Sequence, residues 1–247
     1  MSVNVVSVVS PVCQHASGIE LLVKSLKEVF DTIDSEPEII LVDDGSLDNS
    51  WQEIKCLAKK YPIIGLKHSR NMGQHQAIYT GLLEASGNMV IVMDCDLQDD
   101  PANIPKLIEA SINTNASVVA FRVTKNNHPY YVLSSKLLNW LLSKIIGIPI
   151  HYKTGNFGCY QKTCVDRIKQ IDRKSFYFPV AVRKVEGDVK SIVVQHKERS
   201  HGESTYNFGS HVKLAFQAIH FSFRKSNLQS SASVELISEK VKSKLLS

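Results

Sequence analysis

Two aspartates, separated by one residue, follow a short apolar run in the middle of the chain. The run is NMVIVM at 88–93, and Asp94-Cys95-Asp96 comes directly after it. In an extended segment residues i and i+2 point the same way, so the carboxylates of Asp94 and Asp96 can reach one cation. Hard divalent cations prefer oxygen ligands and keep open positions for substrate phosphates. The spacing therefore indicates a metal that neutralises the charge on a departing diphosphate.

A second acidic group ends another apolar run. Asp43-Asp44-Gly45-Ser46 follows EIILV, about 50 positions before Asp94. If both runs are strands of one parallel sheet, their carboxyl ends lie at the same edge, where such sheets bind ligands. We therefore expect the two acidic groups to converge in space, with the Asp43 and Asp44 carboxylates available to a base or a ribose.

The elements that must position these groups alternate along the first half of the chain. β-branched apolar runs predict strands at 3–9, 38–42, 63–68, 88–93 and 117–121, the first closed by a turn at Ser10-Pro11. Apolar residues at helical spacing predict helices at 18–32, 50–61, 73–85 and 101–114. This alternation predicts an α/β fold with a mostly parallel sheet flanked by helices.

The second half has a different pattern. The dense apolar stretch 130–150 fits either a buried helix or one lying in a membrane interface, and 211–223 is amphipathic. Strand-like runs occupy 154–162 and 189–197, and 226–233 is a Ser-rich linker. Apolar residues at helical spacing predict a short charged helix over 234–246; they are Val234, Ile237, Val241 and Leu245.

Composition and charge narrow the class of protein. The hydrophobic fraction is 43% and the charged fraction 21%, as in soluble globular proteins. Five scattered cysteines without a C-x-x-C pair argue against zinc or a disulfide framework. Residues 1–123 carry 9 Lys and Arg against 16 Asp and Glu, a net −7, whereas 124–247 carry a net +12. The basic half suits an anionic partner such as phosphate or lipid headgroups, and no nucleic-acid-binding motif is present.

Two features bear on membranes and secretion. No segment reaches the ~18 consecutive apolar residues that span a bilayer. The first 15 residues lack a basic leader and run straight into a strand pattern, so we expect no signal peptide. The expected location is the cytoplasm, with peripheral contact at the inner face of the membrane.

The chain resembles the family 2 glycosyltransferases, which have the A-type nucleotide-diphospho-sugar fold, a Rossmann-like architecture. It is most similar to their dolichyl- and polyprenyl-phosphate sugar transferase branch. The matching segments are VVSPV (8–12), EIILVDDGSLDNS (38–50), HSRNMGQHQAIYTGLLEASG (68–87), VIVMDCDLQDDP (90–101), GNFGCYQKTCVDRI (155–168) and RSHGESTYNFGSHVKLA (199–215). They occur in the expected order over about residues 3–223.

The resemblance implies a role for each matched position. The metal, Mg2+ or Mn2+, is bound by Asp94 and Asp96 with help from Gln98, and Arg199 and Ser204 belong to a loop that closes over the diphosphate. The residues implied to bind substrate are Pro11, Val12, Asp43, Asp44, Arg70, Asn71, Asp94, Gln98, Arg122, Asn156 and Ser204. The residues expected to take part in catalysis are Asp96, Asp99, Asp100 and Arg199.

Departures from the family pattern bear on the acceptor. The first loop reads Pro11-Val12-Cys13-Gln14-His15 where relatives have P-V-Y-N-E, and Gly155-Asn156-Phe157-Gly158 replaces G-D-F-R. A saccharide hydroxyl needs a base to remove its proton, whereas a lipid phosphate is already an anion. Asn156 in place of Asp therefore fits a phosphate acceptor. Thr205 and Gly158, where relatives carry cations, point the other way, and Asp99 or Asp100 is a candidate base for a hydroxyl acceptor.

These observations favour an inverting, metal-dependent sugar transfer from a nucleotide-sugar donor to a polyprenyl phosphate or other lipid-linked acceptor. Transfer to a saccharide hydroxyl in surface-polysaccharide assembly, and a non-catalytic nucleotide-sugar-binding partner subunit, remain the alternatives. We expect a glycosyltransferase domain at 1–225, with a nucleotide-sugar-binding half (1–123) and an acceptor half (124–225), followed by the linker and helix at 226–247. The sequence leaves open a homo-oligomer or a membrane-anchored partner.

Overall fold

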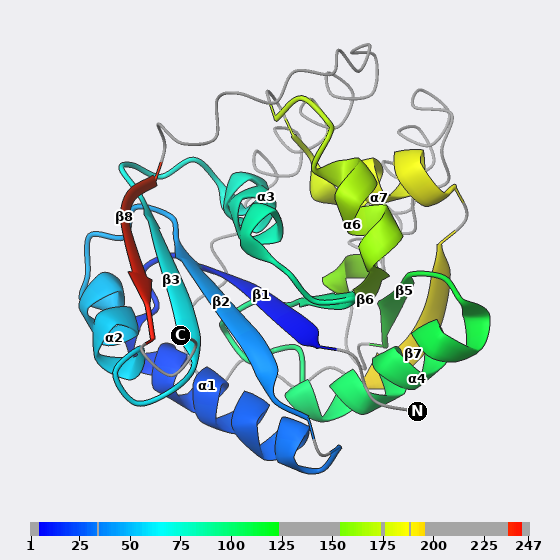
Figure 1. Cartoon of the computed structure of the whole chain (residues 1–247), viewed down its shortest axis with the longest axis horizontal. Coiled ribbons are helices and arrows are strands. Elements are labelled where there is room, and N and C mark those ends of the chain that lie inside the picture. The colour runs from blue at the N-terminus through cyan, green and yellow to red at the C-terminus, as the bar shows by residue number, and fades with distance from the viewer. Residues whose placement is uncertain are drawn as a thin grey trace, which may run out of the picture.

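The computed structural model describes residues 5–33, 35–123, 154–173, 176–187, 189–195 and 237–243. Within these ranges eight strands form one sheet in the order β7-β5-β6-β4-β1-β2-β3-β8 (Figure 1). The strands are β1 (Val6–Val12), β2 (Pro37–Asp43), β3 (Ile63–His68), β4 (Met89–Val92), β5 (Val118–Val123), β6 (Thr154–Gln161), β7 (Lys190–Gln195) and β8 (Ile237–Lys242).

Most neighbouring strands run parallel. The four neighbouring strands β4, β1, β2 and β3 all run parallel to one another, and β5 runs parallel to β7. Only β6 and β8 run against their neighbours. The mostly parallel sheet predicted from the continuous apolar runs is therefore confirmed.

Helices cover both faces of the sheet (Figure 1). One face packs against α1 (Ala16–Asp31), α2 (Ser50–Leu57) and α4 (Ile104–Thr114), which follows the short 3-10 helix η1 (Pro101–Asn103). The other face packs against α3 (Gln74–Glu84), α6 (Lys162–Ile168) and α7 (Phe178–Glu186). The helical spacing of apolar residues predicts α1 to α4 but not α6 or α7.

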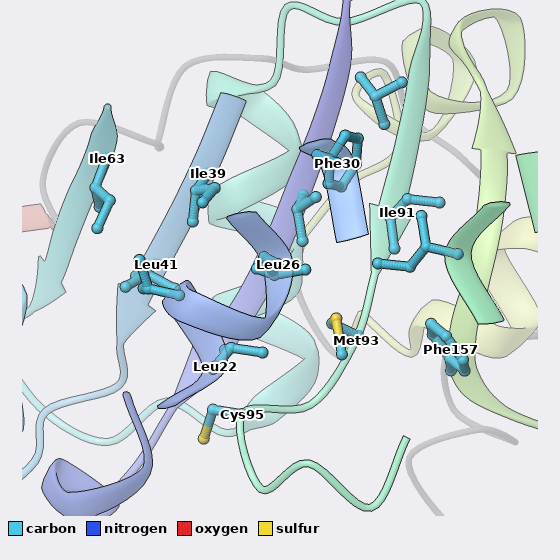
Figure 2. Packing of buried hydrophobic residues seen from close by; sticks show 14 of the residues in the cluster. Leu22, Leu26, Phe30, Ile39, Leu41, Ile63, Ile91, Met93, Cys95 and Phe157 are labelled. Atoms are coloured by element: carbon cyan, nitrogen blue, oxygen red, sulfur yellow. The ribbon is translucent and has the colours of Figure 1, made fainter. Parts of the chain in front are cut away.

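The core beneath α1 shows why that helix forms where it does. Leu22, Leu26 and Phe30 are spaced four residues apart, so they lie on one face of the helix, and all three are fully buried. They pack against the sheet, where Ile39 of β2 and Ile91 of β4 point toward them (Figure 2). This packing fixes the sheet beneath the edge at which β2 and β4 end.

Strand β1 extends further than the turn predicted at Ser10-Pro11, so that prediction is wrong. Pro11 lies inside β1 and aligns with Val42 of β2. Val9 O accepts a hydrogen bond from Met93 N, which shows that odd-numbered residues of β1 face β4. The last pair with β4 is Val9 with Val92. The missing N–H of Pro11 therefore falls beyond the end of that ladder, where a proline costs no hydrogen bond.

The helix predicted over 234–246 is also wrong. Residues 237–242 form β8, which pairs antiparallel with β3 along one edge of the sheet. A register shift between Lys67 and His68 places Ile237 against one core layer and Val241 against the other. Two apolar residues four positions apart are therefore both buried by an irregular strand. The same spacing also occurs on one face of a helix, which is why the sequence predicted a helix here.

Several sequence predictions lie outside the described residues. These are the apolar stretch 130–150, the amphipathic stretch 211–223 and the linker 226–233. In the described part of the chain, no helix combines the length and apolar character needed to cross a bilayer.

Candidate active site

The two acidic groups meet at the carboxyl edge of the sheet, as predicted. Asp43 is the last residue of β2, and Asp94 is the second residue after the end of β4. Strand β1 lies between β2 and β4, so their ends are separated by two strand spacings, about 10 Å. Pro11 and Val12, at the end of β1, lie in the floor between them and are buried. The arrangement places carboxylate oxygens at two strand ends of the same sheet edge.

Asp43 is fully buried, yet one of its oxygens is not used by the fold. Its Oδ1 accepts a hydrogen bond of 3.2 Å from Ser46 N. Its Oδ2 is buried and has no hydrogen-bond partner in the described part of the chain. A buried carboxylate oxygen without a donor costs free energy, and a catalytic role or a bound ion or water is among the explanations for such a group.

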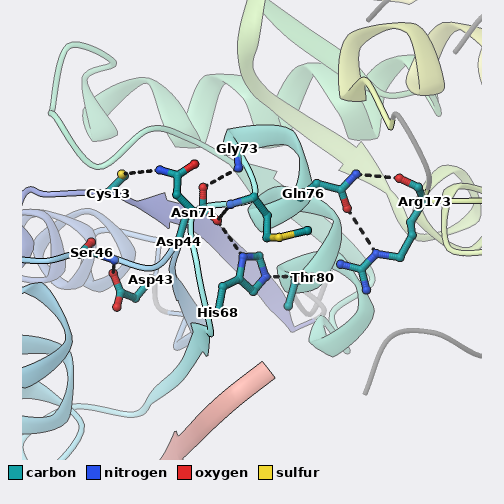
Figure 3. Close-up of polar contacts among 11 residues, drawn as sticks. Cys13, Asp43, Asp44, Ser46, His68, Asn71, Gly73, Gln76, Thr80 and Arg173 are labelled. Atoms are coloured by element: carbon teal, nitrogen blue, oxygen red, sulfur yellow. Dashed lines mark hydrogen bonds and ion pairs between the residues drawn. The ribbon is translucent and has the colours of Figure 1, made fainter. Parts of the chain in front are cut away.

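Asp44, in contrast, is occupied within the protein. Its Oδ1 accepts hydrogen bonds from Met72 N and His68 Nδ1, and its Oδ2 accepts one from Gly73 N, each 2.8 Å long (Figure 3). The other ring nitrogen of His68 lies 2.9 Å from Thr80 Oγ1 in α3. Asp44 therefore fastens the loop between β3 and α3.

Gly45 allows this loop to approach so closely. Its φ of +66° lies in the left-handed region, and a Cβ built there would stand 2.4 Å from the carbonyl carbon of Arg70. Arg70 and Asn71 are exposed on the loop, and the Asn71 side chain donates to Cys13 Sγ at 3.3 Å. The loops after β1, β2 and β3 thus contact one another at the edge that carries Asp43.

The metal motif forms a tight turn after β4. Asp94, Asp96 and Gln98 are partly exposed, and Gln98 N donates to Asp96 Oδ1 at 3.1 Å. The turn places Leu97 at a φ of +57°. Gln74, the first residue of α3, donates from Nε2 to Asp94 Oδ1. Cys95, between the two aspartates, is buried, which together with their charges raises the pKa of its thiol to about 12. The Cys95 thiol is therefore protonated in the metal-free protein.

The described residues fit a cation that the substrate helps to hold. No three His, Cys, Asp or Glu side chains in the described ranges gather closely enough to hold a metal ion by themselves. Two adjacent carboxylates at a strand end are nevertheless the usual protein share of a site completed by substrate phosphates. The donor set of Asp94 and Asp96 is therefore suited to Mg2+ or Mn2+ bound together with a diphosphate.

The sequence that forms these strands and loops matches the model of a known protein family. The model for glycosyl transferase family 2 matches residues 7–175, which include the acidic ends of both strands. The chain belongs to glycosyl transferase family 2.

Named relatives agree with this assignment. The chain is 30% identical over 223 residues to an undecaprenyl-phosphate 4-deoxy-4-formamido-L-arabinose transferase of Aeromonas hydrophila, covering 88% of this chain and 67% of the relative. It is 29% identical to the enzyme of that name from Pseudomonas syringae, covering 88% and 65%. This family 2 glycosyltransferase sequence thus spans about two thirds of the length of these relatives.

Solved structures share the fold at low identity. Glucosyl-3-phosphoglycerate synthase of Mycobacterium tuberculosis in complex with UDP superposes with a TM-score of 0.62 at 16% identity, over 89% of this chain and 79% of that one. Mannosyl-3-phosphoglycerate synthase of Rubrobacter xylanophilus gives 0.63 at 11% identity, over 89% and 73%. The mycobacterial synthase is also known with Mn2+, UDP-glucose and phosphoglyceric acid, at a TM-score of 0.62 and 15% identity over 89% of this chain and 78% of that one.

The glycosyltransferase departs from its family's pattern at two positions of β6, and the structure gives a local reason for one of them, Gly158. Val92 of β4 pairs with Gly158, and Asn156 lies two residues further toward the edge that carries Asp94. A Cβ at Gly158 would stand 2.7 Å from Val118 O, so the arginine of relatives does not fit there. The Tyr160 hydroxyl lies over Gly158 and donates to Asn156 O at 2.8 Å.

The candidate bases of this family 2 enzyme have structural surroundings that the sequence did not reveal. Asp99 is buried, with 2% of its surface exposed. The Asp100 side chain accepts a hydrogen bond of 3.1 Å from Ala102 N and thereby caps η1. In the first loop, the ring of His15 packs against Gly18 in the first turn of α1.

Sequence reasoning missed three residues that open α3 beside the site. Gln74 contacts Asp94, the ring of His75 packs edge-to-face on Tyr177 at 4.4 Å, and Gln76 donates to the backbone oxygen of Arg173 at 2.6 Å. Burial lowers the pKa of His75 to about 4, so its ring is neutral at physiological pH. The signal was present in the sequence, because three polar residues open a helix at the ligand-binding edge.

The remaining predicted site residues lie partly or wholly outside the described residues. Arg122 is a residue of β5, but its side chain is not described. Arg199 and Ser204 fall outside the described ranges. Their predicted contacts with phosphate therefore stay predictions.

Proposed function

We propose that this protein transfers a sugar, with inversion, from a nucleotide-sugar donor to undecaprenyl phosphate or a closely similar polyprenyl phosphate. The observation that carries the donor half is the buried Asp43 Oδ2, which has no partner in the described residues and lies at the same sheet edge as Asp94 and Asp96. The acceptor half is supported by the relatives, whose names specify undecaprenyl phosphate.

The two acidic groups have different roles in this proposal. Asp43 accepts a hydrogen bond from the base or ribose, with Pro11 and Val12 as the floor of the nucleotide pocket. Asp94 and Asp96, with Gln98, hold Mg2+ or Mn2+ against the diphosphate. The ion, when bound, neutralises the charge that develops on the departing diphosphate. Residues 1–123 then serve mainly the donor and 124–225 the acceptor. Arg122 meets the acceptor phosphate, and the loop with Arg199 and Ser204 closes over the diphosphate.

The identity of residue 156 supports a phosphate acceptor. A phosphate oxygen is already anionic and attacks the sugar carbon without losing a proton, so no base is required. Asn156 is buried at the edge of β6 where relatives carry Asp, and it cannot serve as a base. Asp100 caps a helix and Asp99 is almost fully enclosed, so neither is well placed to deprotonate a saccharide hydroxyl. Because polyprenyl phosphates reside in membranes, we place the reaction at the cytoplasmic membrane surface.

Release of nucleoside diphosphate tests the proposal. Candidate nucleotide sugars are incubated with Mn2+ or Mg2+, with and without a short-chain polyprenyl phosphate, and the product is identified by mass spectrometry. Release that rises with the lipid phosphate, and is lost in Asp96→Ala, is the expected result. Release that requires a saccharide instead would assign the enzyme to polysaccharide assembly. Binding without release for every donor would favour a partner subunit.

A further inference from the structure

One short segment joins the two acidic ends of the site. Asp44, after β2, holds the backbone N–H groups of Met72 and Gly73, each at 2.8 Å. The next residue, Gln74, donates its side-chain amide to Asp94, after β4. No residue separates the anchored backbone at Gly73 from the side chain that contacts Asp94. A shift of the anchor is therefore transmitted to the metal motif.

The anchor is fixed on its other side by the same helix. Gly73 O accepts hydrogen bonds from Gln76 N and Ala77 N, so α3 begins at this point. Thr80, two turns along α3, contacts the His68 ring that in turn contacts Asp44. Asp44 thus touches α3 twice, directly at Gly73 and through His68 at Thr80 (Figure 3). Such a closed set of hydrogen bonds leaves the start of α3 little freedom to move.

We infer that Gln74 is a positioning residue for the metal ligand Asp94, and that Asp44 acts on the metal through it without being a ligand. A donor on one carboxylate oxygen sets the rotation of the carboxylate and hence the direction in which it offers electrons. Removing such an outer partner typically weakens metal binding about 10- to 100-fold. The inference deepens the proposed function and rests on its metal site at Asp94 and Asp96.

The coupling also relates donor recognition to the metal. Asp43 and Asp44 are consecutive, so a base or ribose bound at Asp43 lies directly beside the residue that holds Gly73. The nucleotide end of the donor and the diphosphate end would then be bound by parts of one connected structure. Nucleotide and cation are expected to strengthen each other's binding, and this reciprocity is a property of any coupled pair of ligands.

The test measures Mn2+ affinity directly, from the loss of the free-ion EPR signal during titration, with Mn2+ alone and with Mn2+ plus UDP. Gln74→Leu is compared with Gln76→Leu. The second variant removes an equivalent side-chain amide from the same helix, but that amide contacts Arg173 and not Asp94. We expect Gln74→Leu to weaken Mn2+ binding about 10-fold or more, and Gln76→Leu to stay within about two-fold of the parent. Urea unfolding of both variants separates this effect from lost stability.

A double-mutant cycle tests the role of Asp44. Asp44→Asn places an N–H group against a backbone N–H of the loop, so we expect it to weaken Mn2+ binding as well. If both residues act through one segment, Asp44→Asn/Gln74→Leu binds Mn2+ about as weakly as the weaker single variant. Should Asp44→Asn fail to fold, Thr80→Val removes only the hydroxyl that contacts His68 and is expected to weaken binding less.

The outcomes separate the two proposals. Parent-like Mn2+ affinity in Gln74→Leu, or full additivity in the double variant, would overturn the coupling and leave the metal site intact. Absence of Mn2+ binding by the parent, alone and with UDP, would overturn the metal site and the inference with it. Weakening in Gln74→Leu but not in Gln76→Leu, with equal stability, would establish the coupling.

Discussion

Trp51 of α2 donates its indole N–H to the Glu239 carboxylate of β8 at 2.6 Å, across 188 residues of sequence. Lys55, one turn along α2, lies 3.7 Å from the same carboxylate. On the same face of β8, Val241 fills the space above Gly65 of β3, where an added Cβ would stand 2.7 Å from it. The edge strand is therefore held by α2 as well as by β3.

Replacing Glu239 is expected to destabilise the protein. Trp51 is 3% exposed, so Glu239→Ala leaves its indole N–H buried without an acceptor, at a cost of about 1–3 kcal/mol. Glu239→Gln keeps an acceptor oxygen and loses only the partly exposed pair with Lys55, which contributes about 0–1 kcal/mol. Urea unfolding measures both. Equal stabilities for the two variants would show that the indole bond contributes nothing.

Asp43 and Asp44 are expected to respond in opposite ways to the same substitution. Asp43→Asn removes a buried charge with one unpartnered oxygen, so stability should be unchanged or higher while nucleotide affinity falls at least about ten-fold. Asp44→Asn loses a carboxylate that accepts three hydrogen bonds, so stability should fall by about 2–4 kcal/mol. Chemical unfolding and calorimetric titration with nucleoside diphosphates test this contrast. A larger stability loss in Asp43→Asn than in Asp44→Asn would contradict it.

Gly45→Ala should abolish nucleotide binding, because the added methyl group displaces the loop at 70–71. Its Cβ would meet the Arg70 backbone at 2.4 Å, and the backbone must also hold a φ of +66°. Gly187→Ala is the matched control, because its φ is +77° but no atom lies within 4 Å of the added Cβ. Both variants should lose at least about 1 kcal/mol of stability. Only Gly45→Ala should lose nucleotide affinity, and retained affinity would show that the loop tolerates displacement.

Restoring the family residue at position 158 should harm the protein. Gly158→Ala already forces Cβ to within 2.7 Å of a backbone oxygen in a packed sheet, at a cost of about 1–3 kcal/mol. Gly158→Arg adds a long charged side chain against the Tyr160 hydroxyl, and we expect it not to fold. Asn156→Asp, the other reversion, lies nearer the open edge and should give folded protein. The yield of soluble protein and its circular dichroism decide between these outcomes, and a folded Gly158→Arg variant would refute the packing argument.

His75 should make the protein less stable in mild acid. Its pKa is lowered from 6.5 to about 4 in the folded state, so between these values the unfolded chain binds a proton that the folded chain does not. Stability is therefore complete above about pH 6.5 and falls as the pH drops toward 4, by up to about 2–3 kcal/mol. His75→Phe keeps the ring packed on Tyr177 and should lose less stability over this range. Urea midpoints at pH 7 and pH 5 give the comparison, and identical pH dependence in parent and variant would remove His75 as the cause.

The strands that carry the site could be predicted because their signal is local. Strands β2 and β4 are continuous apolar runs, each ended by aspartates, and a strand buried on both faces needs nothing else to be recognised. Parallel alignment then places Asp43 and Asp94 at one edge whatever the loops do. The sequence by itself therefore determined the fold class, the ligand-binding edge and the acidic residues on it.

The tertiary structure decided which of these residues remain available. Asp43 and Asp44 are identical in type and adjacent, yet the loop at 72–73 engages only Asp44, because Gly45 lets that loop come close. Tertiary packing also decided three other features: the pairing of Gln74 with Asp94, the closed space above Gly158, and the formation of β8. Each depends on which distant segment packs against a residue, and the pattern of apolar and polar residues along the chain carries no information about that.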